Sequence, residues 1–179
     1  MIPPMTDTTR RALFALLLLF AGFSACDIKK KDATQDNPSV PEQALEKFSV
    51  TETKQGKPHW TLTAESAQIM EAEKKAYLQA PVVKFFKEGE QVSTLTAQKG
   101  RINTENYDIW GDGNCVLETN EGERLVTKNL HYVSETQKIV TDEKVVLTRQ
   151  KEIVTGVGME ATPDLENITI RKQRVEVRE

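Results

Sequence analysis

Few residues in this chain of 179 amino acids have the type and spacing that catalysis or metal binding needs. His59 and His131 are the only histidines, and neither stands at zinc-ligand spacing from cysteines or carboxylates. Phosphate-loop, G-x-S-x-G and H-E-x-x-H patterns are absent from the sequence. Gly111-Asp112-Gly113-Asn114 resembles part of a calcium loop, but Trp110 stands where a loop that begins at Asp108 needs an oxygen ligand. We therefore interpret residues 111–114 as a hairpin turn, and predict neither an enzyme, a bound metal nor a cofactor.

The chemistry that the sequence does indicate lies at Cys26. Arg10 and Arg11 precede fourteen uncharged, leucine-rich residues (12–25). This run has the size of a signal-peptide core and is shorter than the roughly 20 apolar residues of a membrane span. It ends in small residues before Cys26, which resembles a bacterial lipobox. The pattern predicts cleavage before Cys26 and lipid on this residue, and two or more acyl chains give a stable membrane anchor. The alternative is an ordinary signal peptide in which Cys26 has no role.

The remainder of the chain is mildly acidic. Removal of residues 1–25 leaves 22 basic and 26 acidic side chains, a net charge of −4 that gives no indication of a nucleic-acid partner. Asp27 resembles the signal that retains some lipoproteins in the inner membrane. Residues 26–43 are polar and predict a flexible tether, whereas residues 44–179 predict one folded domain. With Cys26 lipidated, Cys115 has no disulfide partner, and we expect it to be a small buried side chain.

The folded domain is strand-like and repetitive. Short β-branched or aromatic segments alternate with turns that contain Gly, Pro or Asn. The motif Leu62-Thr63-Ala64 recurs three times, and its third residue steps by 33, 30 and 29 positions. The copies end at Ala64, Ala97, Thr127 and Gly156. A second marker, at Val83, Val116 and Val146, keeps the first two steps. A period of this size implies stacked units that cannot bury their apolar faces alone.

Four such repeats, each of three or four short strands, predict an all-β antiparallel jellyroll. We expect an open two-sheet roll of about 12–16 short strands with an apolar interior. Residues 64–76 are rich in helix formers and would be assigned to a helix on propensity alone. Their counterpart in the next repeat, residues 97–109, has no helical character. The repeat therefore predicts a strand, a turn and a strand over residues 64–76.

Four segments in order carry a resemblance to a known family: Gly56-x3-Trp60-x-Leu62-x-Ala64-x2-Ala67, Leu95-Thr96-Ala97-x2-Gly100, Thr127-x2-Leu130-x-Tyr132 and Thr155-Gly156-x-Gly158-Met159. Together they resemble LptC, the periplasmic component of the lipopolysaccharide transport bridge, over about residues 45–170. The resemblance implies a β-jellyroll that accepts lipopolysaccharide, by the acyl chains of lipid A, from an inner-membrane ABC transporter and passes it to LptA. One edge of the roll would dock on the periplasmic rolls of LptF and LptG, which LptB drives, and the C-terminal edge on LptA.

The resemblance also implies a place at the periplasmic face of the inner membrane in a Gram-negative envelope. The family's usual anchor is an uncleaved transmembrane helix, whereas this sequence predicts lipid on Cys26.

Acyl chains need an apolar groove, which a two-sheet roll supplies because alternate strand residues point inward. The packing of an ordinary β-sandwich core explains the same residues equally well. In two strands the direction of the side chains stays open, and Cys115, Leu117, Val145 and Leu147 are an equally good inward set. The candidate lining residues are Trp60, Leu62, Val83, Phe85, Leu95, Ile102, Val116, Leu130 and Val146.

The last strand-like segment, residues 167–178, is a candidate docking edge. Unpaired backbone groups at a sheet edge can accept a strand from a partner protein. The apolar alternation of this segment changes after Ile170, so we expect a bulge or an end near residues 172–174. The candidate docking residues are Ile168, Ile170, and Gly56 and Gly156, which match glycines of the family pattern. Turn or bulge geometry alone would also explain both glycines. As an alternative to docking, the charges of the segment simply keep this edge soluble.

Two other functions stay open at this point. The chain can be a structural or adaptor lipoprotein with a tightly filled core, or an LptA-like bridging protein.

Overall fold

The computed structural model describes residues 43–177, which form antiparallel β-strands joined by turns and one short 3₁₀ helix over Glu71–Glu73. The strands are β1 (Gln43–Lys54), β2 (Lys57–Met70), β3 (Lys75–Gln79), β4 (Val82–Lys87), β5 (Glu90–Thr96), β6 (Lys99–Asn103), β7 (Ile109–Thr119), β8 (Arg124–Val133), β9 (Lys138–Arg149), β10 (Glu152–Ala161), β11 (Ile168–Ile170) and β12 (Arg174–Val177). The predicted all-β antiparallel fold is confirmed.

Several predictions made from the sequence concern residues outside the described part of the chain. They are the signal peptide, Cys26, Asp27 and the tether up to residue 42. The first described strand begins at Gln43, one residue before the predicted start of the domain. Between residues 43 and 177, the chain has no helix with the length and apolar character of a membrane span.

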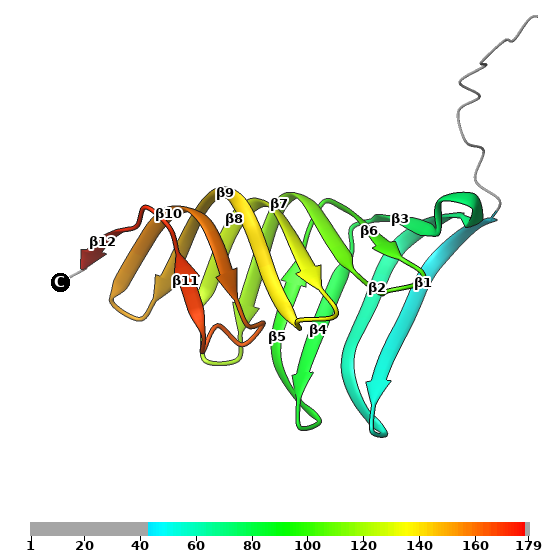
Figure 1. The fold of residues 1–179 in the computed structure, drawn as a ribbon, viewed down its shortest axis with the longest axis horizontal. Helices are drawn as coiled ribbons and strands as arrows, with labels where there is room; N and C mark the ends of the chain where they lie inside the picture. Colours follow the sequence, from blue (N-terminus) through cyan, green and yellow to red (C-terminus); the bar gives the residue numbers. More distant parts are fainter. Residues whose placement is uncertain (1–42, 178–179) are drawn as a thin grey trace, which may run out of the picture. The chain divides into compact units, whose positions relative to one another are not determined.

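Long strands bend midway, so that one continuous sheet folds into two facing leaves (Figure 1). The first half of β2 pairs with β4 and its second half with β3, while β1 pairs with both halves. In the same way β7 pairs with β6 and then β5 on one side, and with β8 on the other. We call the leaf that contains β4, β5 and β12 leaf I, and the leaf that contains β3, β6 and β11 leaf II. The other strands contribute to both.

The strands pass from one leaf to the other along a line that we call the crease. It runs through residues 64–65, 80–81, 97–98, 113–114, 127–128, 142–144 and 156–158. Register shifts interrupt the pairing of β7 with β8, of β8 with β9 and of β9 with β10 at this line. A β-bulge of this kind bends a strand sharply, which is how one strand can belong to two leaves.

The sequence repeat marks the crease. Its four copies end at Ala64, Ala97, Thr127 and Gly156, all of which lie at the crease. One repeat is therefore one pass of the chain from leaf I to leaf II and one return pass. Space is short beside the crease: a Cβ on Gly111 of leaf II would lie 3.0 Å from the sulfur of Cys115 in leaf I and 3.2 Å from the Cβ of Ala97.

The backbone decides three other expectations. The prediction of a hairpin turn at residues 111–114 is wrong, because these residues lie within β7 at the crease. Gly113 and Asn114 have φ values of 73° and 55°, so the turn-forming residues build a bulge rather than a chain reversal. The predicted strand, turn and strand over residues 64–76 is confirmed, and so is the break near residues 172–174, where Lys172 has φ 49°.

Substitution of Gly100 by Ala tests the crease. The new Cβ would meet the backbone oxygen of Trp110 and the ring of Pro81 at under 3 Å, so β6 or β7 must shift. We expect the free energy of unfolding, measured with urea, to fall by about 1–3 kcal/mol. The exposed neighbour variant Lys99→Ala should leave it within about 0.5 kcal/mol. Equal stability of the two variants would contradict a crease that demands small residues.

Candidate functional site

The interior face of leaf I carries an unbroken row of aliphatic side chains. Each member pairs directly with the next across neighbouring strands, from β1 to β12. We call this row the apolar rung; it consists of Val50, Leu62, Val83, Leu95, Leu117, Leu125, Leu147, Val154 and Val175. Its inner members are buried, whereas Val175, at the β12 end, is 50% exposed. The rung is a continuous hydrocarbon surface across nine strands.

Leaf II faces this surface with a second row. Its members also pair strand by strand, and Tyr132 is the one that carries a polar atom. They are Ile69, Ala76, Ile102, Ile109, Tyr132, Ile139, Ala161 and Ile168. The two rows enclose one hydrophobic core that draws on both leaves.

Seven of the nine candidate lining residues point into this core. Trp60, Leu62, Val83, Phe85, Leu95, Ile102 and Leu130 are all buried. The inward orientation expected for Val116 and Val146 is wrong: both are half-buried on the outer face, and Cys115, Leu117, Val145 and Leu147 are the inward set. Both segments are apolar at consecutive positions, so alternation could not choose a face, and each follows the crease, where a bulge reverses the alternation.

The open side of the roll, opposite the crease, is bridged by contacts between the leaves; we call this line the seam. His59 of leaf I lies 3.0 Å from the Tyr132 hydroxyl of leaf II, measured from the ring Nε2. The Phe85 and Tyr132 rings are 5.1 Å apart between centroids, and those of Trp60 and Tyr107 6.2 Å. Burial, and secondarily the nearby Lys54, lowers the pKa of His59, so its ring is neutral at neutral pH. Aromatic groups therefore close one part of the seam without charge.

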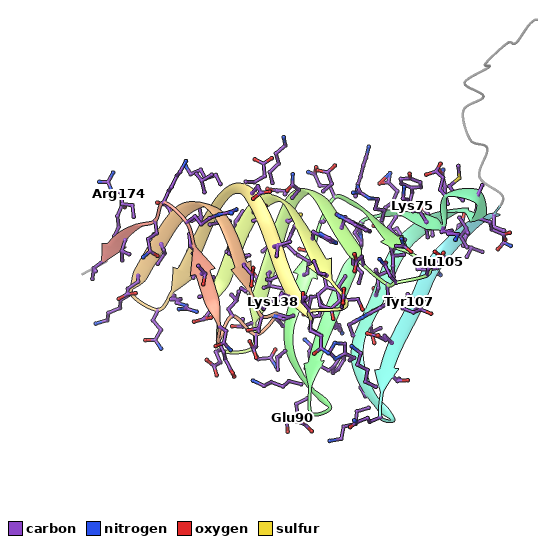
Figure 2. All side chains as sticks on the ribbon, in the orientation of Figure 1. Lys75, Glu90, Glu105, Tyr107, Lys138 and Arg174 are labelled. Atoms are coloured by element: carbon purple, nitrogen blue, oxygen red, sulfur yellow. The ribbon has the colours of Figure 1, made fainter. Side chains whose placement is uncertain are left out.

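Ion pairs close another part of the seam. Lys87, at the end of β4, donates to Asp164 at 2.9 Å and to Glu166 at 2.7 Å in the loop between β10 and β11. Hydrogen bonds to Glu166 and Asp164 raise the pKa of Lys87. Burial opposes the charge on Asp164, but hydrogen bonds from Thr162 and Lys87 outweigh it and lower the pKa of this carboxyl group. Glu90 in Figure 2 marks the nearby tip of the β4–β5 hairpin.

A cavity of about 320 Å³ opens at the seam, and we call it the mouth. Phe85 and Val92 of leaf I line it, together with residues 136–138 and the loop over residues 162–167. Because Phe85 is also part of the hydrophobic core, the mouth borders the interior. Sequence reasoning missed the mouth, since its lining runs from His59 to Asn167 and no local pattern joins residues so far apart.

A larger cavity of about 740 Å³ lies on the outer face of leaf II and is polar in character. It contains a stack in which Arg101 lies over Trp110 at 4.6 Å and Trp110 lies parallel to His131 at 4.4 Å. Asp108 contacts His131 at 3.3 Å. The faces of Trp110 are thus occupied by its own neighbours. Leu130 and Met159 of the hydrophobic core also line this cavity.

The candidate docking residues lie on or beside the end strands of the roll. β1 forms one end of the row of strands, and β11 and β12 form the other (Figure 1). Ile168 and Ile170, on β11, pack against the core. A Cβ on Gly156 would meet Ile170 at 2.2 Å, so this glycine lets β10 and the β11–β12 segment approach, whereas Gly56 occupies the turn between β1 and β2 with open space around it. The structure explains both glycines without a partner, and their docking role stays a prediction.

Cys115 is a packing residue. Its side chain is buried beside the crease, and burial, with a smaller contribution from Asp112, raises the pKa of the thiol to about 12. This agrees with the expectation of an inert buried cysteine. Among the described residues, no group of histidines, cysteines and carboxylates is arranged to hold a metal ion.

Comparisons with known proteins agree with this architecture. The model of the family of LptC-related lipopolysaccharide-assembly proteins matches residues 12–176. No curated protein sequence matched the chain. Among solved structures, the crystal structure of LptH, the LptA-homologous periplasmic component of the lipopolysaccharide transport device of Pseudomonas aeruginosa, matches with a TM-score of 0.53 and 12% identity. That match covers 79% of this chain and 100% of LptH, and shows a shared fold. Because the family model spans nearly the whole sequence, this chain belongs to the LptC-related family of lipopolysaccharide-assembly proteins.

Proposed function

We propose that this chain accepts lipopolysaccharide from the inner-membrane ABC transporter in the interior of its roll and passes it to LptA. The apolar rung is the observation that carries the proposal. At about 4.8 Å per strand, nine strands give a hydrocarbon path of about 38 Å. Each acyl methylene that leaves water for such a surface gains about 0.8 kcal/mol. Membership in the LptC-related family supports lipopolysaccharide as the lipid.

The ends of the path support the proposed partners. Val175 and Val177 on β12 are 50% and 71% exposed, and Leu45 on β1 is 39% exposed. Exposed apolar side chains beside unpaired strand edges favour continuation of the sheet by another roll. We infer that LptF and LptG dock at the β1 edge and LptA at the β11–β12 edge.

The anchor completes this proposal. Lipid on Cys26, with Asp27 as the retention signal, would hold the chain at the periplasmic face of the inner membrane. A tether over residues 26–43 spans up to about 55 Å at about 3.1 Å per residue, which lets the roll reach a transporter without fixing its orientation.

Photo-crosslinking in living cells tests the carrier function with two adjacent positions. A photoreactive side chain at Leu117 points into the roll, whereas one at Val116 points out of it. We expect adducts with lipopolysaccharide from position 117, and from Phe85 at the mouth, and none from position 116. Absence of adducts from every inward position would favour the structural-adaptor function instead.

The ion pairs of the seam should restrain lipid entry. Lys87→Ala removes both cross-leaf ion pairs, while Arg124→Ala removes the Arg124–Glu118 pair, whose strands lie side by side within leaf I. We expect faster amide exchange in residues 162–167 and association of lipopolysaccharide about two- to fivefold faster in the first variant. The second variant should behave as wild type. Unchanged exchange in the loop of the Lys87 variant would show that the seam is closed by other contacts.

Removal of β12 tests the C-terminal edge. A chain that ends at residue 173 lacks the exposed strand, whereas one that ends at residue 177 keeps it. We expect the shorter chain to lose capture of purified LptA while lipopolysaccharide adducts from Phe85 persist. Capture of LptA by both chains would place the docking surface elsewhere.

A further inference from the structure

A second inward row of leaf I lies between the apolar rung and the hairpin tips. Its members also pair strand by strand: Glu52, Trp60, Phe85, Ser93 and Thr119. We call it the polar rung, because every member except Phe85 carries a nitrogen or oxygen atom. The change from polar to purely aliphatic takes place within two residues along each strand.

Three atoms of the polar rung, on Trp60, Ser93 and Glu52, are buried without a hydrogen-bond partner among the described residues. The first two, Nε1 of Trp60 and Oγ of Ser93, belong to residues that are fully buried, with an exposed fraction of 0%. The third is Oε2 of Glu52, next to Trp60 in the rung. A buried polar group without a partner costs stability, so native proteins rarely keep one.

Farther along the same rung, Thr119 and Arg149 contact other groups of the protein. The Thr119 hydroxyl accepts a hydrogen bond from the backbone N–H of Glu123 at 3.1 Å. Beyond it, Arg149 pairs with Glu123 at 2.7 Å and donates to the backbone oxygen of Leu165 at 2.7 Å. Nε of Arg149 makes this ion pair without hydrogen-bond geometry. Glu52, Trp60 and Ser93, which carry the other unpartnered atoms, lie on β1, β2 and β5.

That region lies at the mouth. Phe85, which pairs with Trp60 on one side and Ser93 on the other, lines the mouth, and so does Val92, which precedes Ser93 in the chain. An acyl chain that enters past Phe85 would pass Trp60 and Ser93 first and reach the apolar rung next. Polar groups near the entrance and hydrocarbon beyond it match a ligand that is polar at one end of its chain.

We propose that Trp60 and Ser93 bind the polar linkage of an incoming acyl chain, and that the linkage is a neutral hydroxyacyl ester or amide. The indole N–H can only donate, so it takes the carbonyl oxygen. The Ser93 hydroxyl donates or accepts, which suits a hydroxyl group a few atoms along the chain. Glu52 would repel a free carboxylate or a phosphate at this place, and its Oε2 can accept from an amide N–H or a hydroxyl. This inference rests on the proposed function and adds the chemistry by which the interior recognises its lipid.

Two probes with the same chain length separate this recognition from burial of hydrocarbon. One is a glucosamine lipid with hydroxyacyl amide and ester chains, and the other is its analogue with unhydroxylated alkyl ether chains. Binding to the mature chain is measured by displacement of an apolar fluorescent dye. The variants are Ser93→Ala and Trp60→Phe, with Thr96→Ala, an exposed residue of the same strand as Ser93, as the control.

We expect each rung variant to bind the hydroxyacyl probe about three- to tenfold more weakly, the loss of one hydrogen bond, and to bind the ether probe as wild type does. Ser93→Ala should not lower the melting temperature of the unliganded chain, because the hydroxyl it removes has no partner to lose. The control should match wild type with both probes.

Three results would contradict either the proposed function or the linkage recognition. If wild type binds neither probe, the proposed function itself fails. If wild type binds both and the rung variants bind the hydroxyacyl probe unchanged, the carrier function stands and the linkage recognition fails. If the rung variants weaken both probes equally, the two residues serve the shape of the interior, and the linkage recognition fails as well.

Discussion

The convergence of the two leaves at the crease is the constraint on which the interior depends. Strands that begin in one leaf end in the other, so backbone and side chains crowd along a single line. At Gly111, a Cβ would lie 3.0 Å from the sulfur of Cys115 in the other leaf and 3.2 Å from the Cβ of Ala97, so a larger residue there requires its neighbours to move. The bulges at this line absorb the bend. With the crease held closed by small residues, the leaves can diverge toward the seam and leave their aliphatic side chains facing one another.

Different kinds of interaction hold the two leaves together at the seam. Its contacts are a histidine–tyrosine hydrogen bond, aromatic pairs and ion pairs from Lys87 to Asp164 and Glu166, all between residues distant in sequence. Such exposed ion pairs each contribute little to stability. A roll with one tightly packed side and one weakly held side can admit a ligand at the seam without loss of the fold at the crease. The mouth lies on the weakly held side.

The polarity of the interior also decreases from the seam inward. Near the mouth the polar rung includes a buried indole N–H and a buried hydroxyl without partners, and beyond it the apolar rung is entirely aliphatic. The larger outer cavity of leaf II has the reverse arrangement, with its aromatic and charged groups already paired to one another. The unpartnered indole N–H and hydroxyl are therefore in the interior, whereas the stacked groups of the outer cavity contact one another.

The sequence by itself determined the all-β fold class and the repeat of about thirty residues. It also predicted a strand, a turn and a strand over residues 64–76. All three follow from periodicity along the chain. The sequence also indicated the inward side of Trp60 and Leu62, whose strand alternates cleanly. Only the tertiary structure decided that Leu117 rather than Val116 faces inward, because a single extra residue in a bulge exchanges the faces of a strand. The mouth, the seam and the unpartnered atoms of the polar rung likewise depend on how the leaves close on each other. Contacts between positions more than seventy residues apart leave no trace in a local pattern.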